Sequence, residues 1–167
     1  MAKSPRSSQQ ASDIFELTSR SAEETQQLGE RLGVLLRAGD VVGLIGELGS
    51  GKTTFVHGVA KGMGLDSAAV KSPTFVLMRE YRGRLPLIHV DGYRLEHPDQ
   101  ALGLDVDWLF SPTRVTVIEW AERLSSTLPS DYLELRFAHK TANQRAISAA
   151  AHGPRSRELL TQLVNRP

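Results

Sequence analysis

Residues 46–53 read Gly-Glu-Leu-Gly-Ser-Gly-Lys-Thr, a complete G-x-x-x-x-G-K-[ST] P-loop. The glycines of such a loop let successive backbone N–H groups point at phosphate oxygens. Lys52 adds a positive charge for the β- and γ-phosphates, and the hydroxyl of Thr53 can ligate Mg²⁺. Because the apolar run 41–45 precedes the loop as a buried strand would, the pattern predicts a site for a nucleoside triphosphate.

Two other apolar runs each end in an acidic residue. The run 85–91 ends in Asp91, and the run 115–119 ends in Glu119. A P-loop site needs a carboxylate at the end of a neighbouring strand, either to hold Mg²⁺ through water or to orient the attacking water. We therefore expect at least one of the two acids to serve the metal. The alternative is that each acid simply begins the loop after its strand.

Further polar residues lie between these motifs. Residues 72–75 read SPTF, and Thr74 could reach the γ-phosphate or its Mg²⁺ as a GTPase switch threonine does. A plain turn at the start of a strand would explain the same residues. His89 and His97 suggest a metal cluster, but no matching ligand spacing accompanies them, so a structural role is favoured. Trp120 is either part of the core or a flat surface beside the nucleotide.

Composition bounds the class of protein. The 167 residues suit one domain; we expect a disordered tail over 1–12 and a P-loop ATPase domain over 13–167. The absence of cysteine excludes disulfides and thiolate metal sites. No signal peptide is recognisable, and no apolar run approaches the roughly 20 residues of a membrane span, so we expect a cytoplasmic protein. A net charge of +1 gives no case for sequence-independent nucleic-acid binding.

The elements that must position these residues follow from periodicity and turn signals. A capping box at 21–24 opens a helix that ends before 39–40, and 52–63 form the helix whose N-terminus faces the phosphates. Arg-Gly-Arg at 82–84 favours a hairpin, so part of the sheet is antiparallel. We predict a single-domain α/β P-loop NTPase with a mixed parallel and antiparallel sheet flanked by helices. The remaining expected strands are 13–18, 41–45, 74–81, 85–91, 115–119, 132–137 and 145–149, and the remaining helices are 98–104 and 155–164.

Four motifs occur together in one order along the chain. They are GELGSGKTT at 46–54, SPTF at 72–75, HVDGYRL at 89–95 and IEW at 118–120. In order and spacing they resemble the TsaE (YjeE) family of bacterial P-loop ATPases. The resemblance extends from about residue 21 to residue 149.

The resemblance implies a Mg²⁺-dependent ATPase in the pathway that makes N6-threonylcarbamoyladenosine in tRNA. Members of that family bind a TsaB–TsaD heterodimer, and their ATP hydrolysis is expected to reset that complex while TsaD carries out carbamoyl transfer. The tRNA itself would be met only indirectly, and no membrane would be involved.

The resemblance also implies roles for particular residues. Thr53 and Glu119 would hold Mg²⁺, while Lys52, Asp91 and Glu119 would be catalytic. Thr74 would be the switch residue, and Trp120 would lie at the rim of the nucleotide pocket. The phosphates would be held by Gly49, Ser50, Gly51, Lys52, Thr53 and Thr54.

Two more nucleotide contacts are implied at Ser21 and Arg145. From the residues alone, Ser21 is also explained as a helix N-cap and Arg145 as a solvated strand end. Both interpretations stay open at this point.

Other functions share the P-loop. A small-molecule kinase would need an acceptor pocket and usually a mobile lid with several arginines, whereas the arginines here are scattered. A nucleotide-dependent scaffold that does not hydrolyse ATP is a third possibility. A GTPase is disfavoured because no Asn-Lys-x-Asp motif occurs. Since no arginine-rich lid is evident, we expect slow hydrolysis by the isolated chain and a partner that completes the site.

Overall fold

The computed structural model describes residues 14–73 and 77–165. Its strands form one sheet in the order β1-β7-β6-β2-β5-β4-β3. The strands are β1 (Ile14–Ser19), β2 (Val41–Gly46), β3 (Met78–Tyr81), β4 (Leu87–Asp91), β5 (Val115–Glu119), β6 (Leu133–His139) and β7 (Arg145–Ala151). The helices are α1 (Ala22–Leu35), α2 (Lys52–Gly62), α3 (Val106–Leu109) and α4 (Pro154–Asn165), with 3₁₀ helices η1 (Ser67–Ala69), η2 (Pro98–Gly103) and η3 (Ala121–Leu124).

The predicted mixed sheet is confirmed. Strand β2 runs parallel to β5 and β6, and β4 runs parallel to β5. The pairs β1–β7, β3–β4 and β6–β7 are antiparallel, so the turn at 82–84 does join a hairpin. Because parallel strands point the same way, the carboxyl ends of β2, β4 and β5 meet at one edge of the sheet. Gly46, Asp91 and Glu119 are the last residues of those strands.

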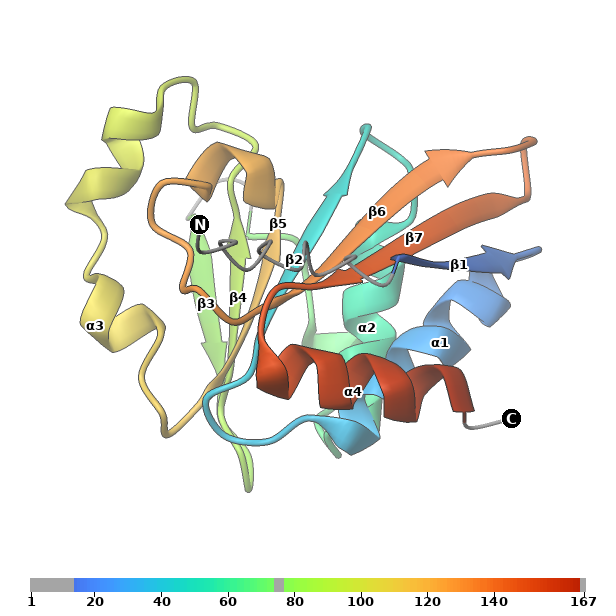
Figure 1. The fold of residues 1–167 in the computed structure, drawn as a ribbon, viewed down its shortest axis with the longest axis horizontal. Helices are drawn as coiled ribbons and strands as arrows, with labels where there is room; N and C mark the ends of the chain where they lie inside the picture. The colour runs from blue at the N-terminus through green and yellow to red at the C-terminus, as the bar shows by residue number, and fades with distance from the viewer. Residues whose placement is uncertain (1–13, 74–76, 166–167) are drawn as a thin grey trace, which may run out of the picture.

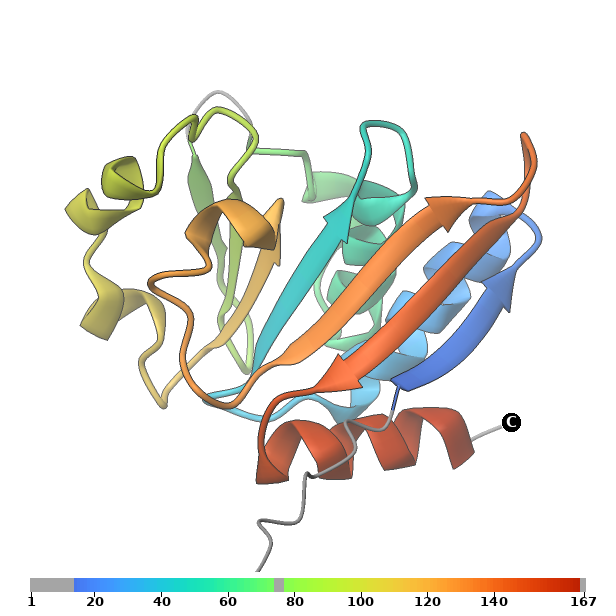
Figure 2. The ribbon, with the colours of Figure 1, turned by 45° about the horizontal axis from the view of Figure 1, so that its top comes forward.

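Helices pack on both faces of this sheet (Figures 1 and 2). Helices α1, α2 and α4 bury leucines and Phe55 against the inner side chains of β2, β6 and β7. The opposite face of β2, β5 and β4 carries a smaller core around Ile88 and Ile118, covered from the η2, α3 and η3 region. The sequence did not predict α3 or η3, and the short helix expected at 98–104 is the 3₁₀ helix η2.

Helices α1 and α2 pack with their backbones in contact. A Cβ atom added to Gly29 would overlap the carbonyl oxygen of Phe55, and one added to Gly58 would overlap that of Gln26. Only glycine fits at such a distance, so the two helices form one unit. Each helix carries two of these glycines four residues apart: Gly29 and Gly33 on α1, Gly58 and Gly62 on α2.

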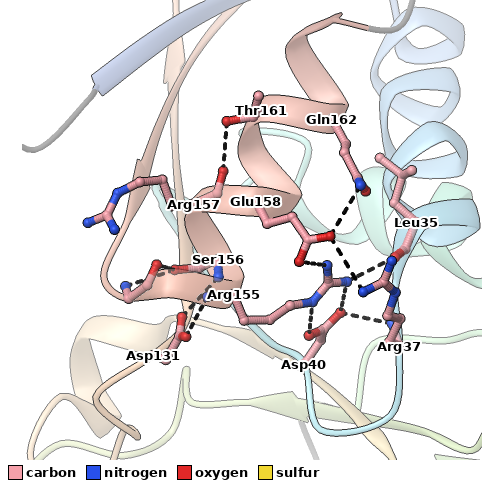
Figure 3. Close-up of polar contacts among 11 residues, drawn as sticks. Leu35, Arg37, Asp40, Asp131, Arg155, Ser156, Arg157, Glu158, Thr161 and Gln162 are labelled. Atoms are coloured by element: carbon pink, nitrogen blue, oxygen red, sulfur yellow. Dashed lines mark hydrogen bonds and ion pairs between the residues drawn. The ribbon is translucent and has the colours of Figure 1, made fainter.

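A polar network fixes α4 to the rest of the fold (Figure 3). The carboxylate of Asp131 accepts hydrogen bonds from the backbone N–H groups of Arg155 (2.8 Å) and Ser156 (3.0 Å), which caps the helix N-terminus. The Arg155 guanidinium forms two hydrogen bonds with Asp40 (2.9 and 2.8 Å) and a third with the carbonyl of Leu35 (3.1 Å). The network thereby ties α4 to the end of α1 and the start of β2.

The predicted tail over 1–12 and the start of the strand expected at 74–81 lie outside the described residues. Within 14–73 and 77–165, every helix is too short or too polar to span a bilayer.

Candidate functional site

The P-loop connects the end of β2 to the first turn of α2. Gly49 and Gly51 have φ of 76° and 105°, in the left-handed region that favours glycine. A Cβ atom on Gly46 would lie 2.8 Å from the carbonyl oxygen of Phe137 on β6, so the loop starts in close contact with that strand. These three glycines let the loop turn back over the N-terminus of α2, where backbone N–H groups favour an anion.

The ammonium group of Lys52 is folded onto its own loop. Its Nζ donates hydrogen bonds to the carbonyl oxygens of Gly46 (2.5 Å) and Glu47 (2.9 Å), and it lies 4.5 Å from the ring centroid of Trp120. Burial lowers the pKa of Lys52. Three nearby carboxylates oppose that shift: Glu119, Glu122 and Asp91. A phosphate group in the loop would offer this cation stronger acceptors than two carbonyls.

Thr53 and Glu119 face each other at the start of α2 and the end of β5. The Thr53 hydroxyl lies 2.9 Å from Oε1 and 3.0 Å from Oε2 of Glu119. Nε2 of His89, from β4, lies 2.8 Å from the same Oε1. Glu119 is therefore a buried carboxylate with two hydrogen-bond partners, and the sequence did not indicate that His89 would be one of them.

Asp91 lies beside Glu119, because β4 and β5 pair these two residues in register. Its Oδ2 accepts a hydrogen bond from the Ser72 hydroxyl (2.8 Å), and its Oδ1 accepts one from the backbone N–H of Tyr93 (2.9 Å). The carboxylate is thus fixed from both sides, and Ser72 links it to the SPTF segment. Thr74 itself lies outside the described residues.

A cavity of about 260 Å³ opens over these groups. A second cavity of about 390 Å³ adjoins it and shares Gly49, Gly51 and Thr54 with it. Ser21 and Arg145 both line the second cavity, together with Asn143. The residues that line the first are Leu48, Gly49, Gly51, Lys52, Thr53, Thr54, Ser72, Asp91, Tyr93, Glu119 and Trp120.

The two interpretations given for Ser21 and for Arg145 have different outcomes in the structure. The Ser21 hydroxyl accepts a hydrogen bond from the N–H of Glu24 (3.1 Å), so it is an N-cap and a cavity residue at once. Arg145 donates from Nε to the carbonyl of Ser50 in the P-loop (3.1 Å). Its guanidinium also reaches carbonyl groups of the β6–β7 turn. Arg145 therefore contacts the P-loop and is more than a solvated strand end.

Trp120 lies at the rim of the first cavity, half-buried. Its backbone is left-handed (φ 56°), a conformation in which a bulky residue is strained. The ring of Tyr93 packs 5.2 Å from it, and the Arg123 guanidinium lies 4.9 Å from its centroid. Sequence spacing left Arg123 unnoticed, because its contact depends on the turn that Trp120 makes into η3.

The oxygen atoms around Thr53 fit Mg²⁺, which prefers carboxylate and hydroxyl ligands and keeps several waters. Among the described residues no group of three or more His, Cys, Asp or Glu side chains could hold a metal, so the ion would depend on phosphate and water for most of its ligands. His97 is the N-cap residue of η2 and lines a different hollow, and in the described part of the chain it forms no metal-binding group with His89.

Comparison with known proteins gives consistent matches. The family model described as threonylcarbamoyl adenosine biosynthesis protein TsaE matches residues 19–147. Proteins named tRNA threonylcarbamoyladenosine biosynthesis protein TsaE are 38% identical over 142 residues in Bacillus subtilis (84% of this chain, 88% of that one) and 40% identical over 132 residues in Treponema pallidum (79% and 97%). A crystal structure of YdiB from Bacillus subtilis superposes with a TM-score of 0.77 at 30% identity, covering 92% of this chain and 95% of that chain. Since the matched span holds the P-loop, both strand-end acids and Arg145, the chain belongs to the TsaE family of threonylcarbamoyl adenosine biosynthesis proteins.

Proposed function

We propose that this chain is a Mg²⁺-dependent ATPase required for N6-threonylcarbamoyladenosine modification of tRNA, acting on a TsaB–TsaD complex. The observation that carries the proposal is the pairing of the Thr53 hydroxyl with Glu119 in the cavity that Lys52 also lines. A hydroxyl, a carboxylate and a lysine around a P-loop are the groups that P-loop ATPases use. The pathway comes from the names of the relatives.

In this proposal the chain binds and orients the triphosphate. The loop from Gly49 to Thr54 and the Lys52 ammonium hold the β- and γ-phosphates and neutralise their charge. Thr53 and Glu119 would hold Mg²⁺, which supplies further neutralisation of the phosphate charge. Asp91, fixed by Ser72 and Tyr93, would assist hydrolysis or hold the water shell of the metal. Thr74 remains the predicted switch residue.

The second cavity is proposed to take the nucleoside. It adjoins the phosphate cavity and lies between the start of α1 and the β6–β7 turn, where Ser21 and Arg145 are found. Trp120 would lie at the rim of the nucleotide pocket formed by the first cavity. The absence of a guanine motif in the sequence favours adenine over guanine.

Hydrolysis by the isolated chain is proposed to be slow. Among the residues that the structure describes, Lys52 is the one cation that lines the phosphate cavity. P-loop enzymes gain a factor of about 10³–10⁵ in rate from an arginine finger, which here a partner would supply. The TsaB–TsaD heterodimer is the partner we propose, with tRNA met only through it, in the cytoplasm.

The test is ATP turnover with and without TsaB–TsaD, measured for the wild type, Lys52→Ala and Glu119→Gln. We expect slow turnover that the partners accelerate. Lys52→Ala should lose nucleotide binding, whereas Glu119→Gln should retain binding and lose turnover. Fast turnover that ignores the partners would contradict partner dependence. Binding without turnover under any condition would favour a scaffold, and phosphoryl transfer to a small molecule would favour a kinase.

A further inference from the structure

His89 is a buried residue of β4, and its side chain contacts Glu119 of the candidate metal site. Its side chain is 0% exposed, and its Nε2 lies 2.8 Å from Oε1 of Glu119. Nδ1, the other ring nitrogen, has no hydrogen-bond partner in the described part of the chain. Within the described residues the imidazole thus makes one polar contact, and that contact is to Glu119.

This asymmetry indicates which ring nitrogen carries the hydrogen that faces Glu119. A buried N–H without an acceptor costs about 1–3 kcal/mol. A proton on Nδ1 would be such a donor, and it would leave Nε2 as an unprotonated nitrogen facing a carboxylate. A proton on Nε2 lets the ring donate to Glu119 and leaves only a bare acceptor at Nδ1.

A hydrogen-bond donor suits a buried carboxylate that must keep one orientation to bind a cation. Glu119 is 3% exposed, and a carboxylate this buried needs hydrogen-bond donors. An imidazole that donates from Nε2 supplies one of these donors and fixes the carboxylate in one orientation.

The two partners of Glu119 come from different elements. Thr53 belongs to the P-loop helix α2, whereas His89 belongs to β4. The backbone of Glu119 belongs to β5, and the Thr53 hydroxyl contacts its carboxylate from the side of the P-loop helix. The hydrogen bond to His89 contacts the same carboxylate from β4, the neighbouring strand of the sheet, so the carboxylate is held from two sides.

We propose that His89 is a positioning residue that holds Glu119 in the orientation required for Mg²⁺, an inference that rests on the ATPase function proposed above. Partners of this kind, one step removed from a metal, typically contribute about 10–100-fold to metal affinity or activity. A histidine that only fills space in the core would contribute to folding and leave the metal dependence unchanged.

The test compares His89→Leu, which removes the donor, with His89→Gln, which keeps a neutral N–H donor at a similar reach. Thr116→Val is the matched control, because it removes one buried hydrogen bond of the same sheet, from Thr116 to the Leu109 carbonyl (2.6 Å), on the face away from Glu119. Calorimetry measures the affinity for a non-hydrolysable ATP analogue as a function of Mg²⁺ concentration, after circular dichroism has shown that each variant is folded.

We expect His89→Leu to need about tenfold more Mg²⁺ for half-maximal binding, with little change in binding without metal. His89→Gln should recover most of that loss, and Thr116→Val should behave as the wild type. Equal Mg²⁺ dependence in His89→Leu and the wild type, or equal loss in both His89 variants, would overturn the inference alone. A wild type without Mg²⁺-dependent binding would overturn the proposed function with it.

A measurement on the wild type keeps the inference testable even where the variants do not fold. Nitrogen NMR of the histidine rings should show His89 as the Nε2–H tautomer, and its Hε2 resonance should shift when Mg²⁺ is added to the analogue complex. An Nδ1–H tautomer, or an Hε2 resonance that does not shift when Mg²⁺ is added, would contradict the positioning role of His89.

Discussion

Glu119 is the residue that links the P-loop helix α2 to the neighbouring strand β4. Its carboxylate is buried and contacts Thr53 of α2 and His89 of β4. Burial of an isolated carboxylate is costly, and two donors reduce that cost. The alternative that Glu119 only begins a loop does not account for these contacts. Asp91, held by Ser72 and Tyr93, is fixed in the same way.

Arg145 is the residue whose predicted role is the most direct to test. Arg145→Gln removes the hydrogen bond to the Ser50 carbonyl and part of the cavity wall. Loss of a hydrogen bond of about 1 kcal/mol should raise the dissociation constant for ATP about fivefold, measured by calorimetry. Arg136→Gln, on the neighbouring strand and paired with Glu134, is the control and should bind as the wild type. An equal effect of both substitutions would show that Arg145 makes no specific contribution to nucleotide binding.

At the scale of elements, the close pairing of α1 and α2 positions both cavities. The start of α1 lines the second cavity, and the start of α2 forms the phosphate end. Because the glycines bring the helix backbones into contact, neither helix can shift without the other.

Gly58→Ala tests this packing. Alanine favours a helix over glycine by about 1 kcal/mol, so an open site would be stabilised. Here the added methyl group would overlap the Gln26 carbonyl, and overpacking of this kind costs about 1–3 kcal/mol, so the clash should win. Urea unfolding should show net destabilisation. Gly103→Ala, where a Cβ meets nothing within 4 Å, should be close to neutral. A stabilised Gly58→Ala would show that the helices can separate.

The cap of α4 predicts a dependence of stability on pH. Burial would raise the pKa of Asp131, but the hydrogen bonds from Ser156 and Arg155 and the charge of Arg155 outweigh it and lower the pKa. A carboxyl with a lowered folded-state pKa stabilises the fold above its unfolded pKa of about 3.9, and this contribution is lost as the pH falls through the folded value. Thermal unfolding should therefore lose stability below about pH 4, and Asp131→Asn should reduce the difference between pH 7 and pH 3. An unchanged difference would contradict the role of Asp131.

Local patterns predicted much of this arrangement, and tertiary contacts explain what they missed. The P-loop motif is a contiguous run, and each strand-end acid follows its own apolar run, so local patterns predicted them. The helices α1 (Ala22–Leu35) and α2 (Lys52–Gly62) follow from the capping box at 21–24, the periodicity and the P-loop. The contact of His89 with Glu119 depends on β4 lying next to β5, which the sequence alone does not specify. The four-residue helix α3 is too short to show a period, and the position of Arg123 depends on the left-handed turn at Trp120.

At the scale of the whole molecule, the site is assembled from residues far apart in the chain. The two cavities take residues from the start of α1, the P-loop, the ends of β4 and β5, and the β6–β7 turn. A ligand that bridges them should therefore stabilise the entire fold rather than one loop.

Thermal unfolding with Mg²⁺ and a non-hydrolysable ATP analogue measures this effect. At a ligand concentration 100 times the dissociation constant the gain is about 2.7 kcal/mol. For a chain of this size that gain corresponds to a rise in Tm of roughly 5–10 °C. Lys52→Ala should lose most of the rise. A rise of the same size in that variant would mean that the analogue binds elsewhere.

The pairing of β1 with β7 has a consequence for the order in which the protein is made. Ile14 aligns with Ala150 and Ser19 with Arg145, so β1 stays without this partner until β7, far along the chain, has been synthesised. Contacts of such long sequence separation form late, because the intervening loop must close first. On the ribosome, the P-loop emerges about a hundred residues before Arg145, which donates a hydrogen bond to the Ser50 carbonyl of that loop. The nascent chain therefore carries its phosphate-binding sequence well before it has a complete nucleotide pocket, and it gains that pocket only when the end of the sheet has left the exit tunnel.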